Sequence, residues 1–102
     1  MRVISIQLMN GLEIIGKFDE VETDEVAICL VDPIRLVETQ DGRGNVGLAF
    51  APWSYSVSEK SASFFIQAMV RYPLPVSPQV EQQYIQATTG IVVPEKGKIL
   101  HG

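Results

Sequence analysis

Hydrophobic and polar residues alternate at the start of the chain in the manner of a β-hairpin. Ile4, Ile6 and Leu8 are separated by polar residues, which is typical of a strand with one buried face. Asn10 and Gly11 follow, a pair that favours a tight primed turn with positive φ at both residues. We therefore expect the segments on either side of this pair to form two antiparallel strands.

The return strand contains a glycine at a position where an apolar side chain would be expected. Gly16 lies with Leu12, Ile14 and Phe18 on one face of residues 12–18. Glycine weakens a flat strand, but sharply bent sheets use glycine kinks and bulges to fold over themselves. A side chain at such a bend would collide with the sheet that folds over it. The pattern therefore predicts that the sheet bends at Gly16.

Short apolar segments separated by turn residues continue through the middle of the chain. Residues 26–31 are apolar on both faces and predict a central strand. Asp32 and Pro33 after this run predict a bend or bulge. Cys29 within this run is expected to be a small buried hydrophobe, and Trp53 is expected to be a packing residue. The predicted strands cover residues 26–31, 34–39, 46–50 and 64–72, the last of them divided near 67–68.

The hydrophobic spacing becomes helical towards the C-terminus. Ser77 followed by Pro78 is typical of an N-cap and the first turn of a helix. Val80 and Tyr84 then recur on one face, and a glycine follows as a natural stop. The pattern predicts a short amphipathic helix over residues 78–89.

Length and composition limit the class of protein. The 102 residues allow one modest core, with residues 1–76 forming the β-structure and residues 77–102 a helix and tail. The tail can add an edge strand or remain mobile, and the sequence leaves both open. The net charge of −4 excludes an overall basic field for nucleic acid. A single cysteine, together with the lack of any apolar segment long enough for a membrane, favours a cytoplasmic protein.

Residues suited to catalysis or metal binding are scarce. The single histidine, His101, is the penultimate residue, where a Ser–His–Asp or Cys–His arrangement has no rigid support. The acidic residues of 19–25 do not have the spacing of a calcium loop and are expected to form a solvated connection. We therefore predict that the protein is not an enzyme and has no metal or other cofactor.

Residues 8–18 resemble the first half of the Sm motif of Sm-like (LSm) proteins. The matching positions are Leu8, Asn10, Gly11, Gly16, Lys17 and Phe18. Residues 26–33 and 64–75 resemble the strands that follow in the same family. The long polar connection over residues 51–60 and the C-terminal helix are closer to divergent members carried by phages and marine viruses. The resemblance implies a mainly β fold, a strongly bent five-stranded antiparallel barrel, here with a C-terminal helix.

The resemblance also implies a closed homo-oligomeric ring of about five to seven subunits, in which the fourth strand of one subunit pairs with the fifth of the next. Such pairing would cover the two exposed edges that an open bent sheet leaves. Sm-like proteins associate with RNA, and the resemblance points to Lys17, Gln67, Arg71 and Tyr72 as single-stranded RNA contacts. For Arg71 and Tyr72, packing between subunits is an alternative role.

The same comparison leaves a second function open. Family members that bind RNA carry an aromatic residue and an asparagine in the loop after the bent strand, and here that loop, residues 19–25, is acidic. A ring that has lost RNA binding and binds a protein partner would show this pattern. The C-terminal helix would then be the docking surface, with Val80, Tyr84 and Ile85 as anchors. For Val80 and Tyr84, packing in the chain's own core is an alternative.

Overall fold

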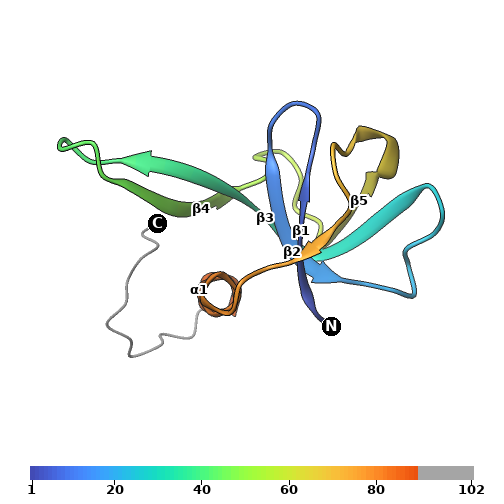
Figure 1. Ribbon diagram of the computed structural model, residues 1–102. Coiled ribbons are helices and arrows are strands. Elements are labelled where there is room, and N and C mark those ends of the chain that lie inside the picture. The colour runs from blue at the N-terminus through green and yellow to red at the C-terminus, as the bar shows by residue number, and fades with distance from the viewer. Residues whose placement is uncertain (90–102) are drawn as a thin grey trace.

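The computed structural model describes residues 1–89, an antiparallel β-structure with one C-terminal helix (Figure 1). The fold is therefore mainly β, as predicted. The elements in chain order are β1 (Val3–Gln7), β2 (Glu13–Phe18), β3 (Ala27–Gln40), β4 (Val46–Pro52), β5 (Ser61–Phe65), the short 3-10 helix η1 (Ile66–Ala68), β6 (Leu74–Pro75) and α1 (Pro78–Thr89). The predicted interruption near 67–68 is confirmed, because η1 lies there, but the predicted strand bounds of 64–72 are wrong. Strand β5 covers Ser61–Phe65, and after η1 Met69 forms only an isolated bridge with Leu8.

Strand β3 is the centre of the sheet. The strand order is β4-β3-β2-β1-β6, and β5 pairs with the first half of β3 while β4 pairs with its second half. The pairing path does not close, so the expected closed five-stranded barrel is not formed by strand pairing. Strand β6 is only two residues long because Pro73 and Pro75 lack the backbone N–H that a longer ladder needs.

Backbone hydrogen bonds nevertheless join the chain after β5 to the first hairpin. The N–H of Met9 donates to the carbonyl of Ala68 at 2.8 Å, and the N–H of Val70 donates to Gln7 at 2.9 Å. The chain thus crosses from the β3 side of the sheet to the β1 side. The result is a strongly bent sheet, open at one side.

The bend occurs at a bulge between β2 and β3. Ile15 lies opposite Ile34, but Lys17 lies opposite Val31, so the register shifts between these two pairs. Asp32, inside the shift, has φ of 52°, a left-handed conformation that aspartate tolerates better than most residues. The bulge that the Asp-Pro pair predicted is therefore confirmed, although β3 continues through it.

Gly16 lies on the inner side of this bend, in close contact with β3. A Cβ atom added to Gly16 would be 2.8 Å from the Cβ of Leu30, closer than real side chains approach. The conflict is with an atom fixed to the backbone, which cannot move aside as a side-chain tip can. The predicted reason for this glycine, collision with the folded-over sheet, is confirmed.

The first hairpin turn differs from the prediction. Gly11 has φ of 91°, but Asn10 is not among the described residues with positive φ. The loop has three residues between Leu8 and Leu12, which pair through their backbones, and the N–H of Gly11 donates to the carbonyl of Leu8 at 2.9 Å. The Oδ1 of Asn10 accepts from the N–H of Leu12 at 3.0 Å. This is a three-residue hairpin ending in a left-handed glycine, so the expected primed turn is wrong.

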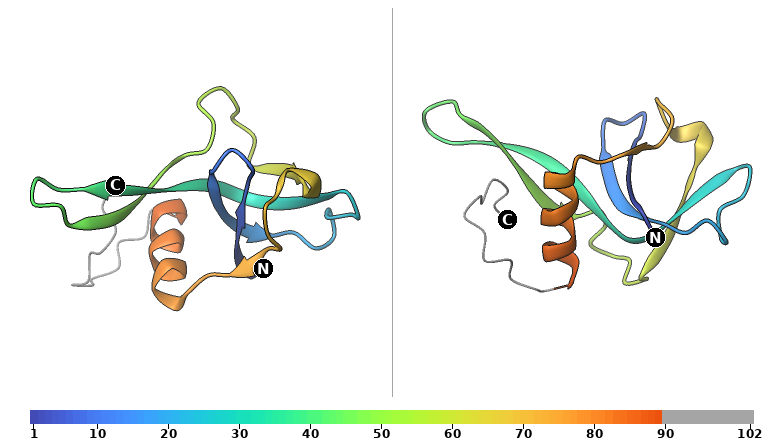
Figure 2. Two further views of the ribbon diagram at one scale, coloured as in Figure 1. Left: turned by 45° about the horizontal axis from the view of Figure 1, so that its top comes forward. Right: turned by 60° about the horizontal axis from the view of Figure 1, so that its bottom comes forward.

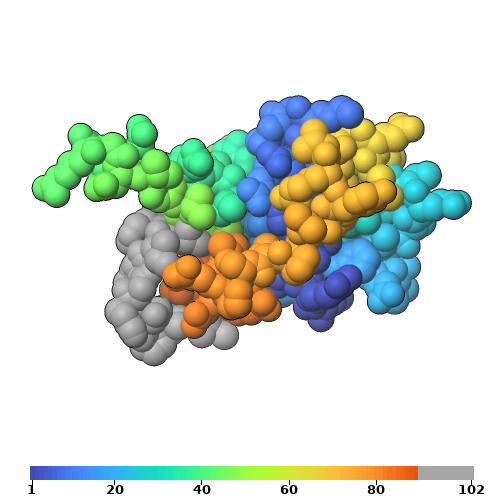
Figure 3. Space-filling model, viewed as in Figure 1, coloured from blue at the N-terminus to red at the C-terminus, as the bar shows by residue number. Residues whose placement is uncertain are grey.

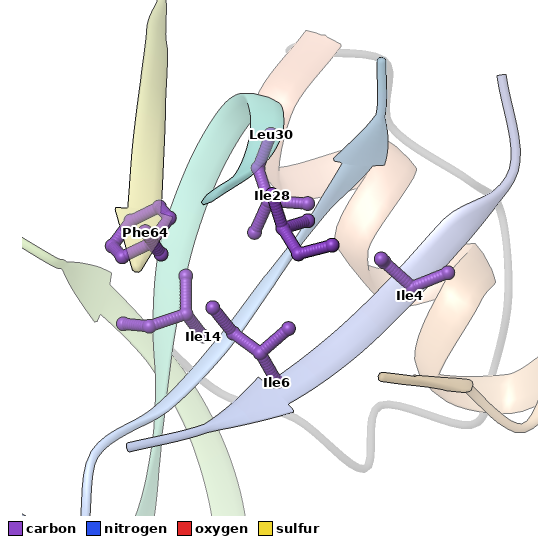
Figure 4. Packing of buried hydrophobic residues seen from close by; sticks show 6 residues of the cluster. All are labelled: Ile4, Ile6, Ile14, Ile28, Leu30 and Phe64. Atoms are coloured by element: carbon purple, nitrogen blue, oxygen red, sulfur yellow. The ribbon is translucent and has the colours of Figure 1, made fainter. Parts of the chain in front are cut away.

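The inner face of the bent sheet holds the larger hydrophobic cluster (Figure 4). Its side chains come from β1, β2, β3 and β5 and point toward one another. The ring of Trp53 packs edge-on against Phe64 with centroids 5.1 Å apart, which confirms its predicted packing role. The buried residues of this cluster are Ile4, Ile6, Ile14, Ile28, Leu30 and Phe64.

Helix α1 packs on the outer face of the sheet, beside the second half of β3 and β4 (Figure 2). It begins and ends at the predicted residues. The Oγ of Ser77 accepts from the N–H of Val80 at 3.3 Å, as expected for an N-cap. Tyr84 is fully buried against Val3 and Ile15, so it packs in the chain's own core. No helix within residues 1–89 is long and apolar enough to cross a membrane.

The second half of β3 and all of β4 form a hairpin, residues 34–52, that we call the arm. It extends away from the rest of the sheet, and its tip stands clear of the body in the space-filling view (Figure 3). The connection between β2 and β3, residues 19–26, lies at the opposite end of the molecule. The fold therefore separates the arm tip from the acidic turn by the length of the molecule.

Candidate functional site

Lys17, the first residue expected to contact RNA, is engaged within the chain. Its Nζ lies 3.2 Å from the Oδ2 of Asp32, and both side chains are mostly shielded from solvent, at 28% and 22% exposed. The ion pair fastens β2 to the bulge in β3. A phosphate group would have to compete with this carboxylate for the charge of Lys17.

Arg71 is also paired, in a small network on the outer face. Its guanidinium donates to the carbonyl of Ser5 at 3.0 Å and to the Ser5 Oγ at 2.7 Å. The Ser5 Oγ donates in turn to the Oε2 of Glu13 at 2.7 Å, and that carboxylate lies 3.5 Å from the guanidinium. The network joins the segment before β6 to β1 and β2. Arg71 thus has a structural role that its position in the sequence did not predict.

Gln67 and Tyr72 are exposed, but they line different grooves. Gln67 borders a groove of about 440 Å³ together with Glu25, Val26, Phe65 and Ile66. Tyr72 is 85% exposed and borders a groove of about 410 Å³ with Ile66, Met69, Val70, Arg71 and Pro73. The four predicted RNA contacts are therefore not gathered into one site.

The exposed side chains around β5 and η1 are unusually apolar. We call this surface the edge patch and define it by Val26, Phe65, Ile66, Val70 and Tyr72, all exposed. Phe65 is 68% exposed although its neighbour Phe64 is buried. Exposed apolar residues gathered in one place are typical of interaction surfaces, whereas single ones are common. The patch adjoins a free strand edge, because β5 pairs only with β3.

The edge patch was not foreseen, but the sequence contained a sign of it. Phe64, Phe65 and Ile66 are three consecutive bulky apolar residues. In a strand with one buried face, alternate side chains point outward, so a continuous apolar run must expose part of itself or be covered on both faces. In this sheet no element among residues 1–89 pairs with the outer edge of β5.

The acidic turn, residues 19–25, is a solvated connection, as expected. The carboxylate of Asp24 accepts from the backbone N–H groups of Val26 and Ala27, both at 2.9 Å, and shapes the entry to β3. Glu20, Glu22 and Glu25 are exposed. Within residues 1–89, no group of three acidic, histidine or cysteine side chains could hold a metal ion.

Two buried polar groups near the bend, the Cys29 thiol and the Tyr84 hydroxyl, have raised pKa values. Burial, followed by the charge of Asp19, raises the pKa of the Cys29 thiol, so this cysteine is a buried hydrophobe as predicted. The hydroxyl of Tyr84 lies 3.1 Å from the carbonyl oxygen of Val31 and 2.7 Å from that of Asp32. Burial, followed by the charge of Asp32, raises the pKa of Tyr84 far above its usual range.

Arg35 is a partly buried cation on β3. Among the described residues, its Nε is the buried side-chain nitrogen or oxygen that has no hydrogen-bond partner. A buried unpaired donor costs about 1–3 kcal/mol. Because this nitrogen is sealed from solvent, it offers no ready contact to a phosphate at the surface.

The sequence matches no family model and no curated protein. The candidate site therefore depends on the features of the described residues alone. These are the free edges of β4 and β5 and of the two-residue β6, an apolar patch beside the edge of β5, and two cations that are already paired with carboxylates.

Proposed function

We propose that the protein is an Sm-like assembly scaffold that forms a closed homo-oligomer. In this assembly the free edge of β4 in one copy pairs with the free edge of β5 in the next copy. The observation that carries the proposal is that β4 and β5 both pair with β3 alone, so each leaves its other edge open. Head-to-tail pairing around a ring would cover every such edge, which an open sheet cannot do by itself.

The edge patch supports this assembly on energetic grounds. Phe65 is the last residue of β5 and Ile66 begins η1, and both line the groove of about 440 Å³ together with Val26. Burial of apolar surface contributes about 25 cal/mol per Å² removed from water. A partner strand added to β5 would cover these side chains while its backbone completes the ladder. Edge pairing and apolar burial would therefore act together at the same place.

Assembly is better supported than RNA binding. Lys17 and Arg71 each face a carboxylate within the chain, at 3.2 and 3.5 Å. Gln67 lies on the rim of a groove that also contains Glu25. The net charge of −4 adds long-range repulsion for a polyanion. Tyr72 remains exposed, but an isolated ring without a neighbouring free cation binds single strands weakly.

The C-terminal helix is not the docking surface in this proposal. Tyr84 is fully buried in the core of its own chain, as the alternative interpretation of this residue predicted. Ile85 is 39% exposed and is the remaining large apolar side chain on that helix at the surface. The edge patch offers a larger apolar surface than this single residue.

The test of the proposed function is the oligomeric state of the full chain in solution. We expect sedimentation velocity and light scattering to give a single species larger than a dimer at micromolar concentration. Phe65→Glu places a charge at the edge patch and should yield folded monomer, shown by an unchanged far-UV spectrum. A wild-type chain that remains monomeric over this range would contradict the proposal.

RNA binding is tested separately with oligo-U and oligo-A at low and moderate salt. We expect no saturable binding up to ~10⁻⁴ M, the weak limit of non-specific affinity. Saturable binding that weakens with salt would instead support the RNA-associated ring that the resemblance implies.

A further inference from the structure

The tip of the arm is a hydrogen-bonded turn that displays a cation and an apolar residue. The carboxylate of Asp41 accepts from the N–H of Arg43 at 2.7 Å and from the N–H of Asn45 at 3.0 Å. The side-chain amide of Asn45 donates to the same carboxylate at 3.0 Å. Arg43 is exposed, and Val46 directly after the turn is 62% exposed. Neither hydrogen bonds nor ion pairs join the guanidinium of Arg43 to another residue within 1–89.

The groove at the opposite end of the molecule has the complementary character. Val26, Phe65 and Ile66 give it apolar walls, and Glu25 gives it a negative rim. Glu25 forms no ion pair with another described residue. The volume of the groove is about 440 Å³, which is large enough for an aliphatic side chain and the stem of an arginine.

The two features lie where a head-to-tail contact requires them. Figure 3 shows the arm tip protruding at one end of the molecule, and the acidic turn and the chain around η1 at the other. Val46 begins β4 and Phe65 ends β5. If β4 of one copy pairs antiparallel with β5 of the next, these two residues meet. The arm tip then extends past the end of β5 toward the groove.

We propose that the arm tip of one copy occupies the groove of the next copy, with Val46 against its apolar walls and Arg43 paired with Glu25. This inference rests on the proposed head-to-tail assembly and adds its register and its charge pairing. A turn already held by Asp41 loses little conformational entropy when it docks. The contact fixes the antiparallel alignment, because a parallel one would place the tip at the opposite end of β5.

The experiment is a charge exchange in the full chain. Arg43→Glu and Glu25→Arg should each weaken association by ~10-fold or more, because each brings like charges together. The double variant R43E/E25R restores opposite charges at every contact and should recover association to within a few-fold of wild type. Glu20→Arg is the matched control, since Glu20 lies in the same acidic turn but does not line the groove. It should change association by less than either single variant.

Association is measured by sedimentation equilibrium, with unfolding in urea as a check that each variant is folded. If wild type assembles and the single reversals do not weaken it, the tip-in-groove contact is refuted and the assembly stands. Weakening by both single variants without recovery in the double variant would also refute the pairing. If wild type is monomeric, the proposed assembly fails and the inference with it, leaving a basic peptide of another protein as the occupant to seek.

Discussion

The two faces of the bent sheet are stabilised in different ways. The inner face is a cluster of six buried apolar residues from four strands, stabilised by apolar burial and close packing. The outer face has fewer buried apolar residues, chiefly Val3, Ile15 and Tyr84, and it includes directional polar contacts. Close packing on one side and hydrogen bonds on the other meet at the same bulge.

The bulge shows how the two faces depend on each other. On the inner side, Gly16 lets β3 approach so closely that no Cβ would fit beside Leu30. On the outer side, the hydroxyl of Tyr84 reaches the carbonyls of Val31 and Asp32, which the register shift has turned outward. The inner face therefore permits the bend, and the outer face holds it in one conformation.

Two adjacent phenylalanines of β5 show the sharpest contrast between the buried inner face and the exposed surface. Phe64 is 7% exposed and packs on Trp53, whereas Phe65 is 68% exposed. Phe64→Ala should lower the free energy of unfolding by about 3–5 kcal/mol. Phe65→Ala should change it by no more than ~0.5 kcal/mol. Urea unfolding at concentrations where both variants are monomeric measures the difference, and comparable losses would contradict the assignment of faces.

The close approach at the bend can be tested with two glycines. Gly16→Ala should cost about 1–3 kcal/mol, because its new methyl group meets a backbone-attached atom of β3. Gly42 has no atom within 4 Å of the corresponding position and does not require a left-handed backbone. Gly42→Ala is therefore the matched control and should be near neutral. Equal unfolding midpoints for the two variants would show that the bend does not depend on this glycine.

Local patterns were enough to predict most of the elements. Alternation predicted β1 and β2, and the Ser77 cap with its following proline predicted the start of α1. The role of Gly16 also followed from sequence, because an apolar strand with one glycine implies a close neighbour. These predictions succeed because each depends on residues a few positions apart.

Features that depend on distant residues were not predictable. Arg71 pairs with Ser5 and Glu13, and nothing near it in sequence identifies these partners. The type of the first hairpin turn was also missed, because the Asn10 side chain accepts a hydrogen bond from the N–H of Leu12 and Asn10 does not have positive φ. The barrel is not closed by strand pairing within residues 1–89, because the chain after β5 pairs with the first hairpin only through the isolated Leu8–Met69 bridge and the two-residue β6. The predicted RNA contacts were therefore residue types in suitable places, without knowledge of their partners.

The outer face is tested most finely by removing one hydroxyl. Tyr84→Phe keeps the ring in the core but loses the hydrogen bond to the bulge, so it should cost about 1–2 kcal/mol at neutral pH. The ring packs edge-on against Phe50, with centroids 6.3 Å apart, and this contact remains in the variant. A Tyr84→Phe variant as stable as the wild type would show that the hydroxyl does not hold the bulge.

The pH dependence distinguishes this hydrogen bond from packing. Burial and the charge of Asp32 raise the pKa of Tyr84 in the folded chain, whereas in the unfolded chain it titrates near ~10. The folded state thus retains a proton that the unfolded state releases, so the wild type loses stability as the pH rises above ~10.

The Tyr84→Phe variant has no hydroxyl at this position to titrate, so its free energy of unfolding lacks this pH-dependent loss. Every other titrating group is shared by the two chains. The difference in free energy of unfolding between wild type and the variant, measured by urea unfolding, should therefore shrink as the pH rises above ~10. A difference that stays constant from neutral to alkaline pH would show that the hydroxyl is not held in its protonated form by the fold.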